Sequence, residues 1–374
     1  MRITCVLRRI AFRKAAALAL LSCSAAMLAA QATVTPPAHD SVARRRIQPL
    51  PALASAPETS LQYGATVLAV WEPAPALRTR PSSITASALR TAKSQTRIRI
   101  EGERWSIGNA RRIAGSLQWQ EFPLPFYGIG DRTATSAGET FTPRGTEGTL
   151  MVQQRIARAW YLTGGVRHLD QRIATDTSGA LRRASVPGST GGVITEWSTG
   201  AMTDTRDNLF APRTGNWVQL TYARSAHGLW SDYSYGTLRL DARTYRAIAA
   251  EHVLAAQLQV TSVDGAAPFD QLALAGNVDI LRGYARGRYR DRTMAAVQGE
   301  YRSPIRHRLG GVLFAGAGTV SPSLDGIGSH RLLPTYGAGL RIEIDHRQRT
   351  GIRVDYGRGR DGASGLYIGF NNAF

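Results

Sequence analysis

Cysteine, lysine and long apolar runs are all scarce in this chain of 374 residues. The only cysteines are Cys5 and Cys23, so removal of the N-terminus would exclude a disulfide framework. Lysine occurs only at Lys14 and Lys93, and arginine therefore supplies nearly all of the positive charge. Outside residues 15–30 no apolar stretch approaches the roughly 20 residues of a transmembrane helix, which excludes a helical membrane bundle. A membrane protein built from strands is not excluded.

The first 32 residues have the pattern of a cleaved export signal. Five basic residues and no acidic one precede the small apolar residues 15–30, and Ala30-Gln31-Ala32 fits a signal-peptidase site. We therefore predict a signal peptide over residues 1–32. Two alternatives stay open, because Leu20-Leu21-Ser22-Cys23 resembles a lipobox and Arg8-Arg9 resembles a twin-arginine pair.

The remaining chain is strongly basic and begins with a proline-rich segment. Without residues 1–32 it has 41 basic residues against 27 acidic ones, a net charge of +14. Such a balance suits nucleic acid or an anionic membrane surface, and the export signal favours the membrane. Residues 33–60 contain several prolines and the run Arg44-Arg45-Arg46 without a helical or strand period, so we predict a linker or plug-like leader there.

From Leu61 to Phe374 the sequence alternates between apolar and polar residues with a period of two. Ile98 and Ile100, for example, alternate with Arg97 and Arg99, and similar charged faces recur along the chain. A soluble β-sandwich also alternates, but it seldom carries so many charges opposite its apolar face. In a membrane barrel the apolar face meets lipid and the charged face lines a wet lumen. We therefore predict an all-β fold, a transmembrane antiparallel β-barrel over residues 61–374.

Counting the alternating segments gives 16 strands, with 14 or 18 as alternatives. The spacing of about 20 residues per strand and connection suits strands of about 9 to 11 spanning residues. The predicted strands are 61–72, 82–93, 95–105, 110–122, 142–156, 158–171, 190–203, 213–225, 231–246, 251–264, 269–276, 291–304, 308–320, 333–345, 350–358 and 364–374.

The last predicted strand ends in an aromatic residue. Leu366, Ile368, Phe370 and Phe374 lie at even spacing along it. A C-terminal aromatic on such a strand resembles the sorting signal of bacterial outer-membrane barrels. We therefore expect the chain to lie in the outer membrane, with the cell's barrel-assembly machinery, outer-membrane lipids and lipopolysaccharide as partners.

Two segments resemble the BamA/TamA superfamily, also called the bacterial surface antigen family. Leu281-Arg282-Gly283-Tyr284 matches the family's loop-tip motif, and Gly299-Glu300-Tyr301-Arg302-Ser303-Pro304-Ile305 follows it at the family's spacing. Asp204-Thr205-Arg206-Asp207-Asn208 and Pro125-Phe126-Tyr127-Gly128-Ile129-Gly130 are also similar to segments of these barrels. The resemblance implies that the loop tip folds back inside the barrel.

Arg282 and Glu300 are the expected clamp of this loop. Glu300 shares the lumen side of its strand with Arg302, and a guanidinium can bind a carboxylate through two hydrogen bonds. In the family the loop arginine also meets an aspartate in a pattern like F-x-D-x-G, but Gly316 stands at that position here. We expect either that the loop is held less firmly or that another acid, such as Glu343, takes the place of this aspartate.

The resemblance implies protein insertion or translocation at the outer membrane, but the front of the chain departs from the family. Relatives carry periplasmic POTRA modules, whereas only 28 residues separate Ala32 from Leu61, so we expect none here. Our first hypothesis is an assembly role in which the seam between the first and last strands opens for unfolded client proteins. The alternative is a passive pore or structural barrel without insertase activity. A lipid-acting enzyme is a third, less favoured hypothesis.

Other motifs do not carry a function. The stretch from Gly357 to Gly362 matches G-x-G-x-x-G, but only twelve residues follow it, and we interpret it as a hairpin turn. No hydrolase or nucleotide-binding motif is present, and the seven histidines do not fall at metal-binding spacing. We therefore expect no catalytic residues, no metal, no cofactor and no nucleic-acid partner.

Overall fold

The computed structural model describes residues 44–374 except 75–78, 135–137, 176–178, 180, 182–185, 250 and 346–348. The predicted signal peptide, residues 1–32, lies outside the described residues. No helix in the described part of the chain is long and apolar enough to cross a membrane. Its helical content is limited to three-residue 3-10 turns, η2 (Ile107–Asn109), η4 (Phe269–Gln271) and η5 (Ile327–Ser329).

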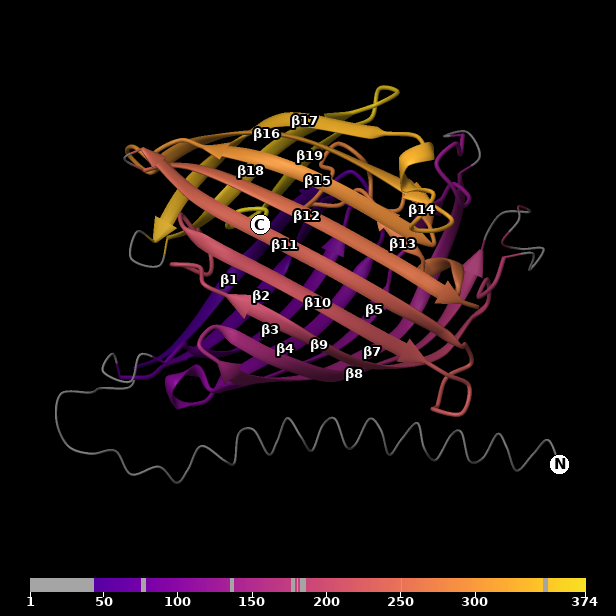
Figure 1. The fold of residues 1–374 in the computed structure, drawn as a ribbon, viewed down its shortest axis with the longest axis horizontal. Coiled ribbons are helices and arrows are strands. Elements are labelled where there is room, and N and C mark those ends of the chain that lie inside the picture. The colour runs from indigo at the N-terminus through magenta and orange to yellow at the C-terminus, as the bar shows by residue number, and fades with distance from the viewer. Residues whose placement is uncertain are drawn as a thin grey trace.

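The chain forms a closed antiparallel β-barrel of 16 strands, which confirms the predicted fold class and strand number (Figure 1). Each barrel strand pairs with its neighbour in the sequence, and β1 closes the sheet against β19. The barrel strands are β1 (Arg44–Ala56), β2 (Ser60–Glu72), β3 (Ser82–Thr91), β4 (Thr96–Trp105), β5 (Arg111–Glu121), β7 (Glu139–Ala157), β8 (Trp160–Thr175), β9 (Gly191–Asp204), β10 (Gly215–Ser225), β11 (Tyr235–Ala249), β12 (His252–Gly265), β15 (Thr293–Arg302), β16 (Leu309–Ser321), β17 (Leu333–Asp345), β18 (Thr350–Gly359) and β19 (Ser364–Phe370). Three short strands complete the fold: β6 (Leu124–Phe126), which pairs with β7, and β13 (Ala273–Ala275) and β14 (Tyr289–Asp291), which pair with each other.

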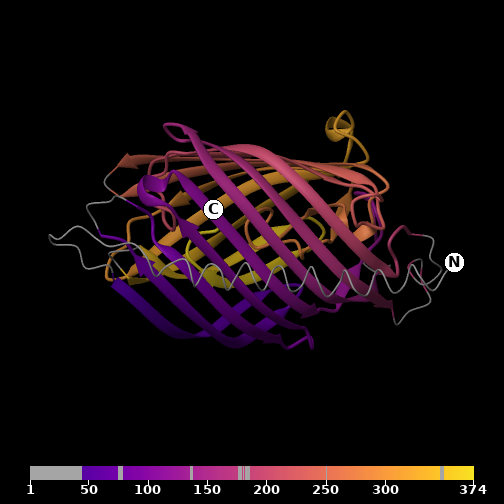
Figure 2. The ribbon, with the colours of Figure 1, turned by 90° about the horizontal axis from the view of Figure 1, so that it is seen from below.

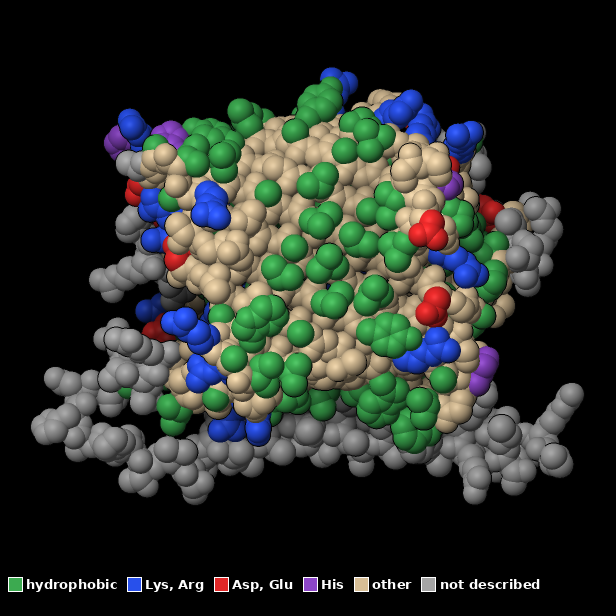
Figure 3. All heavy atoms as spheres, viewed as in Figure 1, with side chains coloured by type: hydrophobic (Ala, Val, Ile, Leu, Met, Phe, Trp, Pro, Cys, Tyr) green, Lys and Arg blue, Asp and Glu red, His purple; other side chains and the backbone are tan. Residues whose placement is uncertain are grey.

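The period-two alternation places apolar side chains outside and charged ones inside. Ile98 and Ile100 of β4 are exposed on the outer surface, whereas Arg353 and Asp355 of β18 are buried in the interior. Figure 3 shows apolar side chains across the middle of one face and charged side chains gathered toward its two ends. A one-residue slip would turn lumen arginines into the bilayer, at about 2 to 4 kcal/mol each near its midplane. The apolar band therefore fixes the register of the strands.

Connection lengths differ between the two ends of the barrel. One end has short connections, such as 158–159 and 106–110, whereas the other carries the long connection 266–292 between β12 and β15. In bacterial outer-membrane barrels the short turns face the periplasm and the long loops face outward. We orient the barrel accordingly, with the connection 266–292 at the extracellular end.

The predicted number of strands is correct although two predictions were wrong, because one predicted strand does not span the barrel and one barrel strand was not predicted. Residues 269–276 do not span the barrel, because only Ala273–Ala275 is extended and this piece is buried inside. A spanning strand needs about 9 to 11 residues. Residues 44–56, which we placed in the leader, instead form β1, so the barrel begins at Arg44 rather than Leu61. The prolines at positions 49 and 51 hid this strand, since proline is tolerated in a sheet only at an edge or a bulge.

Candidate functional site

The connection between β12 and β15 turns back into the barrel. Its strands β13 and β14 form a short hairpin next to the barrel wall (Figure 1), and the tip of the connection is buried. Leu281, Arg282 and Tyr284 of the tip are at most 1% exposed. The apolar tip residues pack with Val320 of β16 and Leu333 of β17. The structure therefore places the predicted loop-tip motif inside the barrel, against the wall formed by β15 to β18.

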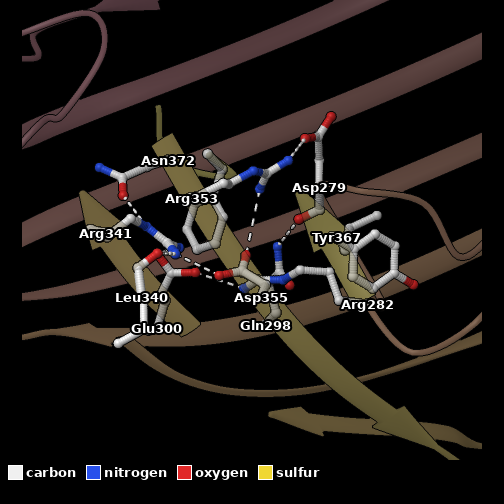
Figure 4. Close-up of polar contacts among 12 residues, drawn as sticks. Asp279, Arg282, Gln298, Glu300, Leu340, Arg341, Arg353, Asp355, Tyr367 and Asn372 are labelled. Carbon is white, nitrogen blue, oxygen red and sulfur yellow. Dashed lines mark hydrogen bonds and ion pairs between the residues drawn. The ribbon is translucent and has the colours of Figure 1, made fainter. Parts of the chain in front are cut away.

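Arg282 lies between two carboxylates at the centre of this contact (Figure 4). Its Nη2 donates to Oε2 of Glu300 at 2.6 Å, and its Nη1 donates to Oδ2 of Asp355 at 2.5 Å. The guanidinium also lies 3.6 Å from the ring centre of Phe314. The structure thus brings Arg282 and Glu300 together, whereas the second acceptor is Asp355 of β18 and not Glu343. A carboxylate on β18 can reach Arg282 because the loop tip lies across the lumen side of strands β15 to β18.

Three further arginines surround these carboxylates. Arg302 donates through Nε to Oε1 of Glu300 at 2.8 Å, and Arg341 donates through Nη1 to Oδ1 of Asp355 at 2.5 Å. Arg353 lies 3.8 Å from Asp355 and also pairs with a loop carboxylate, Asp279, at 3.4 Å. The side chains of Arg282, Glu300 and Asp355 are all 0% exposed. This is a dry network, in which the loss of one partner of a pair costs about 3 to 5 kcal/mol.

Glycines on the wall make room for the backbone of the loop tip. A Cβ on Gly357 would lie 2.6 Å from the carbonyl oxygen of Arg282, and one on Gly359 would lie 2.5 Å from the ring of Tyr284. Gly283 adopts a φ of 119°, which favours glycine, and packs against the backbone of Arg358. The interpretation of residues 357–362 as a hairpin turn holds for residues 360–362, which lie in the turn between β18 and β19, but was wrong for Gly357 and Gly359, which belong to strand β18.

Hydrogen bonds hold the same backbone in place. The N–H of Gly283 donates to Oη of Tyr367 at 2.8 Å, and this hydroxyl donates to the carbonyl of Tyr284 at 3.1 Å. Oγ1 of Thr335 donates to the carbonyl of Arg282. The hydroxyl of Tyr284 donates to the carbonyl of Pro334 at 2.8 Å. Strands β17 and β19 thus fix the tip together with β15 and β18.

The opposite side of the loop rests on the segment Pro125–Gly130. The N–H of Gly130 donates to the carbonyl of Arg290 at 2.8 Å. The Arg290 guanidinium lies 5.1, 5.8 and 5.5 Å from the ring centres of Phe126, Phe141 and Phe269. Cation–π contacts of this kind are stronger when they are desolvated. The PFYGIG motif thus acts as a second support for the loop, a role that the sequence alone did not reveal.

The motif after Asp204 forms the turn between β9 and β10. Oδ1 of Asp207 accepts the N–H groups of Arg213 and Thr214, and Oδ2 pairs with Arg349 of the turn between β17 and β18 at 3.1 Å. Burial alone would raise the pKa of Asp207, but these donors outweigh burial and lower it. This carboxylate therefore links two turns at the periplasmic end of the barrel.

The residues of the predicted C-terminal assembly signal do not lie together in the structure. Leu366 and Phe370 face outward from β19, but the strand ends at Phe370 and Asn371 turns the chain with a φ of 58°. Phe374 is buried among lumen residues, 5.4 Å from the Arg302 guanidinium, and its main-chain oxygen accepts a hydrogen bond from Arg302 at 2.7 Å. Both ribbon views place the C-terminus within the barrel outline (Figures 1 and 2). The expectation that β19 runs to Phe374 was wrong, and the signalling role of Leu366, Ile368, Phe370 and Phe374 stays a prediction.

The seam between the first and last strands is the weakest joint of the barrel. β1 and β19 share one paired position, Ser55 with Ile368. By contrast, β1 pairs with β2 at 13 positions, and β18 pairs with β19 at seven. Among the described residues no group of three or more His, Cys, Asp or Glu side chains lies close enough to hold a metal ion.

A 16-stranded barrel with an apolar outer band and a buried Arg-Gly-Tyr loop tip defines an outer-membrane protein of the kind that folds a long loop into its lumen. The Omp85 superfamily domain matches residues 80–374, and the chain belongs to this superfamily. It is a bacterial outer-membrane β-barrel. No curated protein matches the sequence significantly.

Solved barrels of related architecture share the fold at low sequence identity. BamA from Haemophilus ducreyi lacking POTRA domains 1–3 superposes with a TM-score of 0.57 at 14% identity, covering 88% of this chain and 70% of that one. CdiB from Acinetobacter baumannii gives 0.57 at 12% identity, covering 88% and 66%. CdiB from Escherichia coli gives 0.61 at 10% identity, covering 90% and 64%. The chain thus spans about two thirds of the length of these structures. The part of the chain that the structure describes contains no POTRA domain.

Proposed function

We propose that this barrel assists the insertion or translocation of proteins at the outer membrane, and that the seam between β1 and β19 is where it opens. The observation that carries the proposal is the single paired position at the seam, Ser55 with Ile368. Each ladder hydrogen bond contributes about 0.5 to 1.5 kcal/mol, so separating one pair costs far less than separating any other neighbouring strands. Membership of the Omp85 superfamily and the likeness to BamA and CdiB support the same role.

The buried loop supports this proposal by keeping the wall next to the seam, β15 to β18, rigid. Arg282 and its carboxylates join β15 and β18 through the loop tip, and no comparable network reaches β1 in the described residues. Opening is thus confined to the seam while the rest of the barrel keeps its shape. Outer-membrane lipids, lipopolysaccharide and unfolded client proteins are the partners in this proposal, and the cell's own assembly machinery would insert the chain.

The test is reconstitution of the chain in liposomes with a urea-unfolded client barrel added from outside. We expect the client to fold faster than in empty vesicles, and more slowly with Arg282→Ala, because that variant loosens the wall against which the seam opens. A client rate equal to that in empty vesicles, measured with folded protein present, would contradict the proposal.

A passive pore remains the second candidate, and the wet side of the lumen favours it. Arg99 and Glu101 face the lumen on β4, yet their side chains are 33% and 48% exposed. Water therefore reaches the interior beside these two side chains of β4. Steady conductance in a planar bilayer, indifferent to clients and to Arg282→Ala, would support the pore over the assembly role.

A further inference from the structure

The lipid-facing surface of the barrel is hollowed over strands β7 to β10. The hollow has a volume of about 510 Å³, within the range of about 300 to 1,000 Å³ that is typical of ligand pockets. Its lining is mostly apolar, and its one charged residue is Arg224 of β10. Val152 and Trp197 of the lining are exposed on the outer surface of the barrel. The hollow is therefore separate from the lumen and from the buried loop.

The strand register explains why the surface is hollow here. Gly164 of β8 pairs with Val152 of β7 on one side and with Thr199 of β9 on the other. Thr199 in turn pairs with Tyr222 of β10. A Cβ on Gly164 would meet only the backbone oxygen of Ser198, at 3.9 Å, so nothing in the protein fills the space above this glycine. Two small residues thus lie between two larger ones in one row of paired positions.

The next row of paired residues forms the rim of the hollow. It runs from Val166 of β8 to Trp197 of β9 and Arg224 of β10. Arg224 lies one residue before the end of β10, and the connection 226–234 that follows is at the extracellular end of the barrel. The rings of Trp197 and Trp230, which belongs to this connection, have centres 6.5 Å apart. Because tryptophan gathers at membrane–water interfaces, we place this rim at the level of the outer lipid headgroups.

The guanidinium of Arg224 is held in position but keeps donors for a ligand. Its Nη1 donates to Oδ1 of Asp264 at 3.1 Å, and the same oxygen accepts the N–H of Gly236 at 2.7 Å. Gly236 of β11 pairs with Arg224 and with Asp264, so the ion pair crosses a strand that has no side chain in the way. The Arg224 side chain is 48% exposed, and a guanidinium has five N–H donors. The donors that do not contact Asp264 can therefore bind an anionic oxygen at the membrane surface.

A hollow at this depth is filled by hydrocarbon. The lining of an empty space loses its dispersion contacts on one side, and the core of a bilayer supplies no water to replace them. An acyl chain over Gly164 would contact Val152 on one side and Tyr222 on the other, with Trp197 at the rim. Such a chain has protein on more of its surface than a chain on the convex outside of the other strands.

We propose that the hollow binds one molecule of lipid A, the phosphate-bearing anchor of lipopolysaccharide. One acyl chain lies over Gly164, and a phosphate accepts hydrogen bonds from Arg224. Charge complementarity selects this ligand, because guanidinium groups bind phosphate through charge-assisted hydrogen bonds and lipopolysaccharide brings phosphate to the outer leaflet. The inference rests on the outer-membrane location and on the orientation of the barrel, and it does not depend on the assembly role.

The test measures how much lipid A the full folded chain binds in micelles of a zwitterionic detergent. Lipid A is titrated, bound lipid is counted by native mass spectrometry, and heat-modifiability on a gel shows first that each variant is folded. We expect saturation at one lipid A per chain. Gly164→Leu should weaken binding about tenfold, because its side chain occupies the hollow. Arg224→Gln should weaken binding about fivefold, because the phosphate loses hydrogen bonds to a charged donor.

Two matched controls lie elsewhere on the outer surface. Gly299 of β15 also faces outward, and a Cβ there would meet only the backbone oxygen of Ala255, at 4.0 Å. Gly299→Leu therefore adds the same side chain away from the hollow. Arg144 of β7 forms an exposed ion pair with Glu121 at 3.5 Å, like that of Arg224 with its partner. Arg144→Gln and Gly299→Leu should both leave the affinity for lipid A unchanged.

Three outcomes would overturn the inference. The first is equal affinity of the unaltered chain and of Gly164→Leu, since the hollow would then hold no acyl chain. The second is a loss of affinity in Arg144→Gln as large as that in Arg224→Gln, which would assign the effect to surface charge in general. The third is phosphatidylglycerol binding with the affinity of lipid A and the same response to the variants, because the site would then accept an ordinary anionic phospholipid.

Discussion

The wall from β15 to β18 and the seam between β1 and β19 belong to one sheet, yet they are held by different means. The wall is fixed by the loop tip, where Arg282 joins Glu300 and Asp355 in a network without solvent exposure. The seam is fixed by one residue pair, Ser55 with Ile368. The difference shows that a barrel can keep one joint weak when cross-links inside the lumen stabilise the wall beside it.

The strongest test of this comparison removes the clamp on the wall. Arg282→Ala leaves Glu300 and Asp355 buried with fewer partners, and we expect a loss of about 3 to 5 kcal/mol in unfolding free energy. The folded yield should fall, as measured by heat-modifiability on a gel and by urea unfolding. Arg99→Ala is the control, because its partner Glu101 is half exposed and such a pair contributes about 0 to 1 kcal/mol. Equal losses in the two variants would show that the wall is no more strongly held than the wet side.

Locking the seam tests the other side of the comparison. Ser55→Cys with Ile368→Cys, in a chain with Cys5 and Cys23 replaced by serine, joins the paired positions of β1 and β19. Antiparallel partners lie close enough for a disulfide. We expect about 2 to 4 kcal/mol of added stability, measured by urea unfolding, and a client folding rate reduced to that of empty vesicles until a reductant is added.

The matched control for the lock lies one strand away. Tyr356→Cys with Leu366→Cys joins paired positions of β18 and β19, which stay together in either state of the seam. It should leave client folding unchanged. A locked seam with full client folding activity would place the opening elsewhere in the barrel.

A substitution at Gly357 keeps every charge of the wall and fills only the space that the backbone of the loop tip occupies. A Cβ on Gly357 would lie 2.6 Å from the carbonyl oxygen of Arg282 and 2.9 Å from the nitrogen of Gly283. We expect Gly357→Ala to cost about 1 to 3 kcal/mol, the usual range for overpacking, and to expose the loop to added protease. Gly228→Ala, where a Cβ meets nothing within 4 Å, should change neither measurement. Unchanged stability in Gly357→Ala would mean that the loop tip shifts freely on the wall.

Local patterns in the sequence predicted the fold well, because every strand of a barrel wall has the same alternation of apolar and polar residues. Period-two alternation specifies which face meets lipid, and it located 15 of the 16 barrel strands. The errors fell where another constraint replaces alternation. Strand β1 carries the edge prolines Pro49 and Pro51, and residues 269–276 lie inside the lumen, where both faces of a segment are buried.

The site was predictable only in part, because half of its contacts depend on distant strands. Arg282 and Glu300 belong to two neighbouring motifs, and their contact follows from the side of the strand on which Glu300 lies. Asp355 comes from β18, 73 residues from Arg282 in the sequence, and no local pattern relates the two. A signal did exist in Gly357 and Gly359, since two glycines on the lumen face of one strand mark a close approach of another backbone.

The smallest predicted effect comes from Asp207, which connects the turn before β10 to Arg349 near the wall. Because its pKa is lowered in the folded protein, its contribution is present above the unfolded pKa of about 3.9 and is lost as the pH falls through the lower folded value. The side chain is 32% exposed, so solvent screening keeps this contribution below about 1 kcal/mol. We expect Asp207→Asn to lower stability in urea unfolding at pH 6 slightly and to match the unaltered chain once the pH is below the lowered folded pKa of Asp207. Because the amide oxygen of asparagine can still accept the N–H groups of Arg213 and Thr214, a difference that persisted at low pH would contradict the assignment of the effect to the charge that pairs with Arg349.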